Sequence, residues 1–290
     1  MLKKVFNFLS KFTRNNKFIA FILFLALLLR ILGIKHGFPY IFHPDEPTVV
    51  RSALGVRFFP NPKHFDWPHL YIYLSYFVYM IFATFRKGLE ILNLKSFFSS
   101  ICPILWTDDL VFYLITRIFT AVLGALTALP VYLAGRRIFD ERIALLGALS
   151  MALFPFNVHH SHYSLTDAPM TFLAAWVLYF SACILTDFSL KNFLMAGLFV
   201  GLAASTKYNG GLSALLVAVA FFSYFLGKRD FFRQVFRNIH KPILSAFLAL
   251  LGFLLGTPFA LLDYKTFSRT DGSKGAYWQF TNVGNRSLAD

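Results

Sequence analysis

Two adjacent carboxylates between prolines are the first candidates for chemistry in this chain. Asp45 and Glu46 stand in the run HPDEP, residues 43–47. Proline fixes its own φ and restricts the residue before it, so this run should hold both acids in a fixed shape away from a regular helix. Burial raises the pKa of a carboxyl group, a neighbouring cation such as Arg117 lowers it, and a general base needs such tuning. The pair therefore suits acid–base catalysis, although adjacent acids are also common in ordinary loops.

A second set of polar side chains lies between apolar runs further along the chain. It comprises two groups: His159, His160, His162 and Asp167, then Lys207, Tyr208 and Asn209. Imidazole and carboxylate suit a divalent metal, but the spacing matches no closed zinc motif, and histidines in such a loop also bind phosphate or backbone groups. The sequence indicates no particular cofactor, and a divalent metal is the less favoured interpretation of this cluster. Asp167 could orient a histidine, or else cap a helix at Ala168 and Pro169.

The elements that must position these residues are membrane helices. The chain of 290 residues is 57% hydrophobic and 14% charged, with a mean hydropathy of +0.59, whereas soluble domains average about 45–50% and about 25%. This composition excludes a disordered chain, a disulfide scaffold and a protein with a single anchor. Cys102 and Cys183 match no metal or redox spacing and are expected to be unpaired thiols.

Seven apolar runs are suited to crossing a membrane and predict an all-α, polytopic helix bundle. They are residues 18–34, 110–134, 143–158, 168–185, 193–205, 212–226 and 243–262. An eighth run, 68–85, is expected to be an interfacial or re-entrant helix, because its tyrosines at 71, 73, 76 and 79 suit the headgroup layer. We expect a transmembrane module over 1–262 with a long first outer loop at about 36–109. Residues 263–290 should begin another outer loop, and it stays open whether a C-terminal portion is missing.

The positive charge marks membrane sides. If the amino terminus is cytoplasmic, alternation places fourteen of the 28 Lys and Arg on the cytoplasmic side, at positions 3–17, 136–142, 191 and 228–241. The net charge of +14 is thus not gathered on one soluble face, and we expect no nucleic-acid partner. The stretch 228–241 alternates cations with apolar residues and predicts an amphipathic surface helix that anchors the protein to anionic lipids. The same orientation places the ionisable candidates on the outer side: Asp45, Arg117, Asp167 and Lys207. Ionisable groups near the ends of membrane helices are costly, so their presence on one side indicates function.

The order of these features resembles the GT-C superfamily of integral-membrane glycosyltransferases, in particular the relatives of protein O-mannosyltransferases and aminoarabinose transferases. The resemblance covers essentially the whole chain. It rests on Arg30 with Gly33, HPDEP from His43, WPHLYIYL from Trp67, TRIFTAVLGALTALPVYLAGRRIFDER from Thr116, HSHYSLTDAPMTF from His160, STKYNG from Ser205 and LGTPFALLDY from Leu251. The motifs are short, but their order and spacing relative to the helices are specific.

The resemblance implies an inverting enzyme that moves a sugar from a polyprenyl-phosphate donor to an acceptor at the outer face of a bacterial or archaeal plasma membrane. It implies Asp45 as the base that takes the acceptor's proton, with Glu46 either supporting that base or binding the acceptor, although the two roles could be exchanged. The leaving phosphate needs fixed cations, and Arg117 followed by Lys207 are the choices. Asp167, His162, His160 and Tyr208 are expected on the acceptor side.

Two other classes of protein remain as alternatives. A transporter or lipid flippase would line a midplane pathway with charges and often shows inverted repeats, whereas the charges here favour helix ends. A scaffold that binds an acceptor would need no tuned acid. Arg30 is expected to snorkel or to pack between helices. The sugar, the carrier length, and whether the acceptor is a protein, a lipid or a glycan are left open.

Overall fold

The computed structural model describes residues 17–106, 109–283 and 286–287. The cations at positions 3–14 and Asp108 lie outside the described residues. The helices are α2 (Lys17–Ile31), α3 (Glu46–Gly55), α4 (Leu70–Ile91), α5 (Lys95–Ile101), η1 (Pro103–Trp106), α6 (Asp109–Leu126), α7 (Ala128–Ile138), α8 (Glu141–Leu153), α9 (Pro155–His160), α10 (Asp167–Thr186), α11 (Leu190–Ala204), η2 (Tyr208–Ser213), α12 (Ala214–Phe225), α13 (Phe231–Asn238), α14 (His240–Gly256), α15 (Phe259–Leu262), α16 (Tyr264–Phe267) and α17 (Ala276–Thr281). Two strands, β1 (Asn282–Val283) and β2 (Arg286–Ser287), pair antiparallel.

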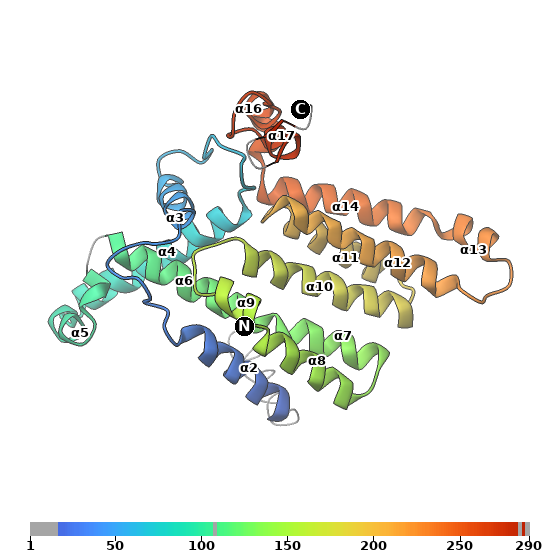
Figure 1. Ribbon diagram of the computed structural model, residues 1–290, viewed down its shortest axis with the longest axis horizontal. Coiled ribbons are helices and arrows are strands. Elements are labelled where there is room, and N and C mark those ends of the chain that lie inside the picture. The colour runs from blue at the N-terminus through green and yellow to red at the C-terminus, as the bar shows by residue number, and fades with distance from the viewer. Residues whose placement is uncertain (1–16, 107–108, 284–285, 288–290) are drawn as a thin grey trace.

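The long helices form one bundle with α10 at its centre (Figure 1). One apolar core lies where α10, α11 and α12 meet, around Val177, Phe193 and Phe221. A second core joins α2, α6, α7 and α8 around Ile19 and Tyr132. The bundle therefore consists of two packed halves on either side of α10.

Among the described residues, four helices are long and apolar enough to cross a membrane. They are Leu110–Ile138, Asp167–Thr186, Tyr208–Phe225 and Phe231–Gly256. The other predicted runs also fall on helices, but α2, α8 and α11 have 15, 13 and 15 residues, short of the roughly 20 that span a bilayer without tilt or thinning. The chain is a multi-pass membrane protein, and the number seven stays a prediction.

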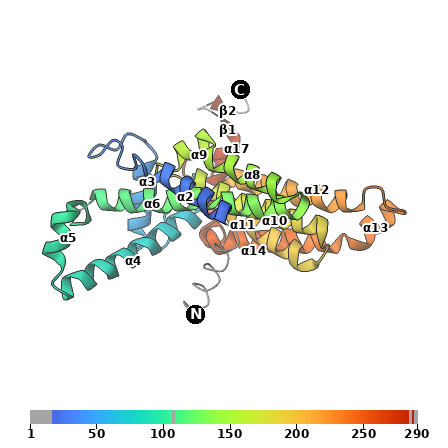
Figure 2. The same cartoon turned by 90° about the horizontal axis from the view of Figure 1, so that it is seen from below.

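Helix α4 packs along α6 and extends with it beyond the rest of the bundle towards α5 (Figure 2). The hydroxyl of Tyr71 lies 2.5 Å from Thr120 Oγ1, and the hydroxyl of Tyr79 bonds to Thr116 in the same way. These two tyrosines are buried, and threonines four residues apart on α6 give their hydroxyls protein partners. The interfacial or re-entrant position of this helix stays a prediction.

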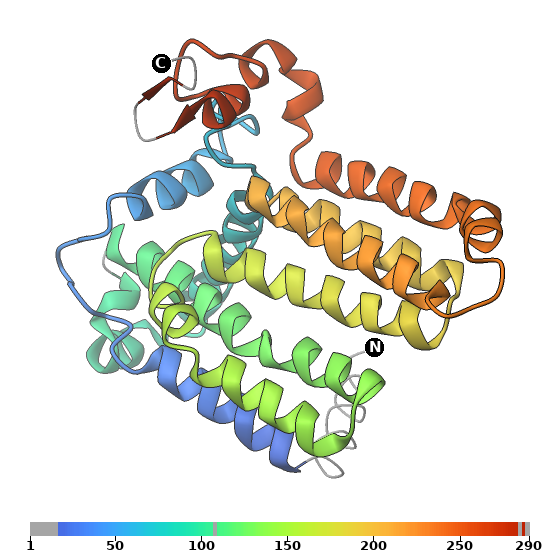
Figure 3. The same cartoon turned by 45° about the vertical axis from the view of Figure 1, so that its right-hand side comes forward.

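The first loop is covered by the C-terminal segment (Figure 3). Asn61 donates to the carboxylate of Asp263 at 2.8 Å, and the backbone N–H of Phe65 donates to the carbonyl of Lys274 at 2.6 Å. Phe65 is fully buried with Ala260 and Ala276. Residues 263–281 thus hold the loop between α3 and α4 in place.

Candidate functional site

A buried ion pair fastens the first loop to α6. The Arg117 guanidinium donates from Nε and Nη2 to the two carboxylate oxygens of Glu46, both at 2.7 Å. Its Nη1 donates to the carbonyls of Ile34 at 3.1 Å and His36 at 2.8 Å, and the Phe38 ring lies 4.7 Å from the guanidinium carbon. Glu46 is 0% exposed and Arg117 is 1% exposed, so this pair is enclosed by protein.

The Glu46 carboxylate also reaches the segment between α8 and α10, residues 154–167, which we call the second loop. Its Oε1 accepts a hydrogen bond from the backbone N–H of Ser164 at 2.8 Å. Arg117 uses four of its five N–H donors, and Glu46 accepts three hydrogen bonds, so both buried charges are paired as burial requires. We infer that both residues hold the loops in position. Only one N–H of Arg117 remains for the predicted contact with a phosphate.

Asp45 has a different environment from its neighbour. It occupies the N-cap position of α3 without capping it, it is half-buried, and no described residue forms a hydrogen bond or ion pair with its carboxylate. The expectation that both acids avoid a regular helix is wrong for Glu46, which begins α3. Pro47 is tolerated there because an N–H in the first helical turn has no partner to lose. Asp45 is therefore the free acid of the pair.

A second ion pair lies where α10 begins. Lys207 Nζ donates to Asp167 Oδ1 at 2.6 Å, and the two side chains are 33% and 27% exposed. Asp167 is the first residue of α10 and Thr166 is its N-cap, so the carboxylate lies at the positive end of the helix dipole. The Lys207 ammonium keeps further N–H donors for a ligand.

The histidines of the second loop are held in three different ways. His162 contacts two carbonyls, with Nδ1 2.8 Å from the oxygen of Val158 and Nε2 2.8 Å from that of Leu32, so both bonds form only when both nitrogens carry a proton. His160 Nδ1 is buried and has no partner in the structure. Burial lowers the pKa of His160, and the nearby Asp167 carboxylate opposes that shift. His159 is exposed and contacts the rings of His160 and Tyr163.

These contacts bring three chain segments together. His160 interacts electrostatically with His43 from the first loop, with His159 and Asp167 from the second, and with Lys207 before η2. Of the predicted residues, Asp167 and Lys207 are in direct contact, and His160 lies within electrostatic range of both. Within the described parts of the chain, no group of three or more His, Cys, Asp and Glu side chains is arranged to hold a metal ion.

Tyr208 and Arg30 serve other contacts. The Tyr208 hydroxyl donates to the carbonyl of Phe65 at 2.8 Å, which joins η2 to the first loop and not to the histidines. Arg30 is fully buried and donates to Asn157 Oδ1 and the Ala152 carbonyl, at 2.8 and 2.9 Å. Of the two expected roles of Arg30, snorkelling and helix packing, the structure shows packing.

Tyr163 and His43 were not among the expected site residues. The Tyr163 ring lies 5.1 Å from the His43 ring and 5.8 Å from the Arg117 guanidinium carbon, so it connects the first loop to the second. Both residues stand inside motifs that carry the family resemblance, HPDEP and HSHY. Their position in those motifs was the signal available in the sequence.

Comparisons with known proteins show which families this chain resembles. The profile of the family described as "Dolichyl-phosphate-mannose-protein mannosyltransferase" matches residues 113–256. Dolichyl-phosphate-mannose–protein mannosyltransferase 1 of Saccharomyces cerevisiae is 29% identical over 188 residues, which are 61% of this chain and 21% of that protein. The structure of the Archaeoglobus fulgidus oligosaccharyltransferase in the apo form is similar with a TM-score of 0.53 and 15% identity, over 91% of this chain and 36% of that one.

These similarities confirm the predicted resemblance to GT-C glycosyltransferases and the all-α fold of that type. The chain spans about a fifth of the yeast relative and about a third of the solved structure. The matched residues 113–256 include Arg117, Asp167 and Lys207, whereas Asp45 and Glu46 precede them.

Proposed function

We propose that this GT-C type membrane protein transfers a sugar from a polyprenyl-phosphate carrier to an acceptor hydroxyl. The observation that carries this function is the contrast between two adjacent acids. Glu46 is locked into a buried pair with Arg117, while Asp45 is half-buried and without a partner among the described residues. A free carboxylate at the edge of a rigid loop is what a general base requires.

The proposed reaction is a single displacement. The Asp45 carboxylate takes the proton of the acceptor hydroxyl as its oxygen forms a bond to the anomeric carbon. The bond from that carbon to the phosphate oxygen breaks, and the phosphate leaves with the electron pair. Attack from the side opposite the leaving group inverts the configuration.

We assign the leaving phosphate to Lys207 with His160 beside it. Lys207 uses one of its donors on Asp167 and is one-third exposed, so its ammonium can reach a ligand. His160 has an unpaired, buried Nδ1, and a phosphate oxygen or a sugar hydroxyl would satisfy it. Arg117, Glu46 and Tyr163 act by holding the two loops together.

The remaining features of the proposal follow from the resemblance and the charge pattern. The loops would lie at the outer face of a plasma membrane, with the amino terminus cytoplasmic. The carrier's isoprenoid chain would stay among the membrane lipids while its phosphate meets Lys207. The family description and the yeast relative favour mannose as the sugar and a protein as the acceptor.

The test is transfer by the full chain in proteoliposomes that contain a radiolabelled polyprenyl-phosphate mannose. Asp45→Asn should abolish transfer of label to a hydroxyl-bearing peptide while the protein still inserts and folds, because no contact of the carboxylate is lost. Glu90→Gln is the matched control, since that acid is exposed and its bond to Lys95 is long, at 3.6 Å. Near-normal transfer by Asp45→Asn would reject the assignment of the base.

A further inference from the structure

The end of the bundle opposite the candidate site carries α13, a short helix with one buried and one exposed face. Val235 is buried, while Phe232 and Phe236 are 74% and 72% exposed. Arg233 and Arg237 are exposed beside them, and neither forms an ion pair with a described carboxylate. The members of each pair are four residues apart, so the aromatic pair and the cationic pair form two adjacent stripes along α13.

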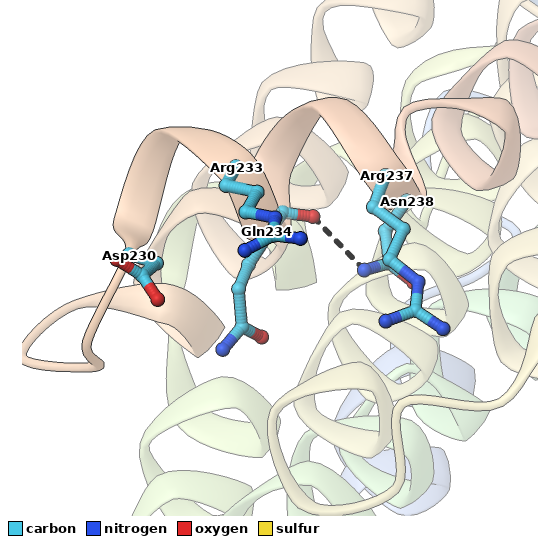
Figure 4. A pocket seen from close by; sticks show the side chains of 5 residues that line it. All are labelled: Asp230, Arg233, Gln234, Arg237 and Asn238. Carbon is cyan, nitrogen blue, oxygen red and sulfur yellow. Dashed lines mark hydrogen bonds between the residues drawn. The ribbon is translucent and has the colours of Figure 1, made fainter.

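The cationic stripe lines a polar cavity of about 470 Å³. Figure 4 shows its five lining side chains, Asp230, Arg233, Gln234, Arg237 and Asn238. The Asn238 amide donates to the carbonyl of Gln234 at 2.9 Å, so the two guanidinium groups are the free donors of the cavity. Guanidinium groups bind phosphate through paired N–H donors, and they outnumber the one carboxylate, Asp230.

An apolar cavity of about 200 Å³ begins close to α13, between α11, α12 and α14. Small side chains line it, among them Gly197, Ala218, Ala246 and Ala249. Gly197 lies directly against the Ser245 backbone of α14, so α11 forms the floor of a groove. The part of α14 that lines the cavity, residues 242–249, is about 10 Å long at a helical rise of about 1.5 Å per residue.

The surroundings of this groove face lipid. The large side chains that flank it on α12 and α14 are widely exposed: Leu215, Val219, Ile243, Phe247 and Leu250 are 54–64% exposed. In a multi-pass membrane protein, such side chains contact acyl chains. The groove therefore opens into the bilayer and starts five residues after Arg237, at Pro242.

We propose that this end of the bundle binds one anionic glycerophospholipid. Its phosphate headgroup lies between Arg233 and Arg237, and one acyl chain enters the groove along Ala246 and Ala249. Phe232 and Phe236 insert at the level where headgroups meet acyl chains. The proposal rests on two features: the charge complementarity between the arginines and the phosphate, and an apolar groove that begins next to the arginines, where the acyl chain of the same lipid would lie. It is independent of sugar transfer.

The test is retention of phosphatidylglycerol by the full chain, counted by native mass spectrometry after purification from vesicles of phosphatidylcholine with a minor fraction of phosphatidylglycerol. Removing both guanidinium groups in R233Q/R237Q should weaken retention about 30-fold, because each surface cation contributes about fivefold. The matched control is R142Q/K191Q, which removes two exposed cations elsewhere on the chain. Ala246→Phe should also reduce retention by filling the groove, whereas Val219→Phe, outside the groove, should not.

Selective loss in R233Q/R237Q and in Ala246→Phe, with unchanged thermal unfolding, supports the site. Equal loss in both charge variants would show that net charge alone attracts the lipid, and would overturn it. Equal retention of phosphatidylcholine and phosphatidylglycerol by the unaltered chain would overturn it as well. Because the readout is bound lipid, a failure here leaves the proposed transferase activity untouched.

Discussion

Replacing Glu46 by Gln should strongly destabilise the protein although the shape of the side chain is kept. The carboxylate is 0% exposed and accepts from Arg117 Nε, Arg117 Nη2 and the Ser164 N–H. A glutamine has one acceptor oxygen, and its NH₂ group would face an N–H of Arg117. The guanidinium would be left buried without a counter-charge, which typically costs about 3–5 kcal/mol.

The measurement is reversible unfolding of the purified chain in mixed micelles, followed by circular dichroism. Asp45→Asn is the matched control, one residue away, and should change the free energy of unfolding by less than about 0.5 kcal/mol. The double variant Glu46→Leu/Arg117→Met should recover most of the loss, since a buried pair can often be replaced by apolar side chains of similar volume. A loss below about 1 kcal/mol in Glu46→Gln would refute the view that this pair fastens the loop.

Three further predictions concern other parts of the molecule. Lys207→Met should lower kcat about 10²–10³-fold, the typical effect of removing one donor to a developing negative charge. Lys265→Met serves as the control. An unchanged kcat of Lys207→Met in the proteoliposome assay would exclude Lys207 from the phosphate contact. Burial of His69 lowers its pKa from 6.5 to about 4, so between these two pH values the unfolded chain binds a proton that the folded chain does not. The free energy of unfolding should therefore be highest above pH 6.5 and should decline as the pH falls towards 4. In unfolding experiments, His69→Gln should remove most of this dependence on pH. Gly201→Val should destabilise the protein by about 1–3 kcal/mol, because a Cβ there would meet the backbone of Ala249. Gly88 has open space around it, so Gly88→Ala should not lower the melting temperature. Similar melting temperatures for the two variants would contradict this packing.

Much of the helix arrangement could be predicted because length and apolar character determine it. Each of the seven apolar runs falls mainly on helical residues. The burial of Tyr71 and Tyr79 could not be predicted, because a phenol is equally suited to a headgroup layer and to a buried hydroxyl partner. Their partners, Thr120 and Thr116, are 49 and 37 residues away in the chain, beyond the reach of a local pattern.

The candidate site was predictable in its members but not in their pairing. The motifs indicated Asp45, Glu46, Arg117, Asp167 and Lys207 as a set. Which acid of the pair meets Arg117 depends on the helical phase of α3 relative to α6, across 71 residues of sequence. The sequence therefore left the roles of Asp45 and Glu46 exchangeable, whereas the structure gives Glu46 alone the contact with Arg117.

The contacts between the first loop and the C-terminal segment have a consequence for biosynthesis. Asn61 and Phe65 emerge from the ribosome about 200 residues before Asp263 and Lys274, their partners. While the intervening helices are being inserted into the membrane, the loop after α3 has local contacts, such as the hydrogen bond from the Tyr73 hydroxyl to the carbonyl of Pro60, but not those of the C-terminal segment. A nascent chain halted before residue 263 would therefore lack the contacts that Asp263 and Lys274 make with this loop, however well its helices had entered the bilayer.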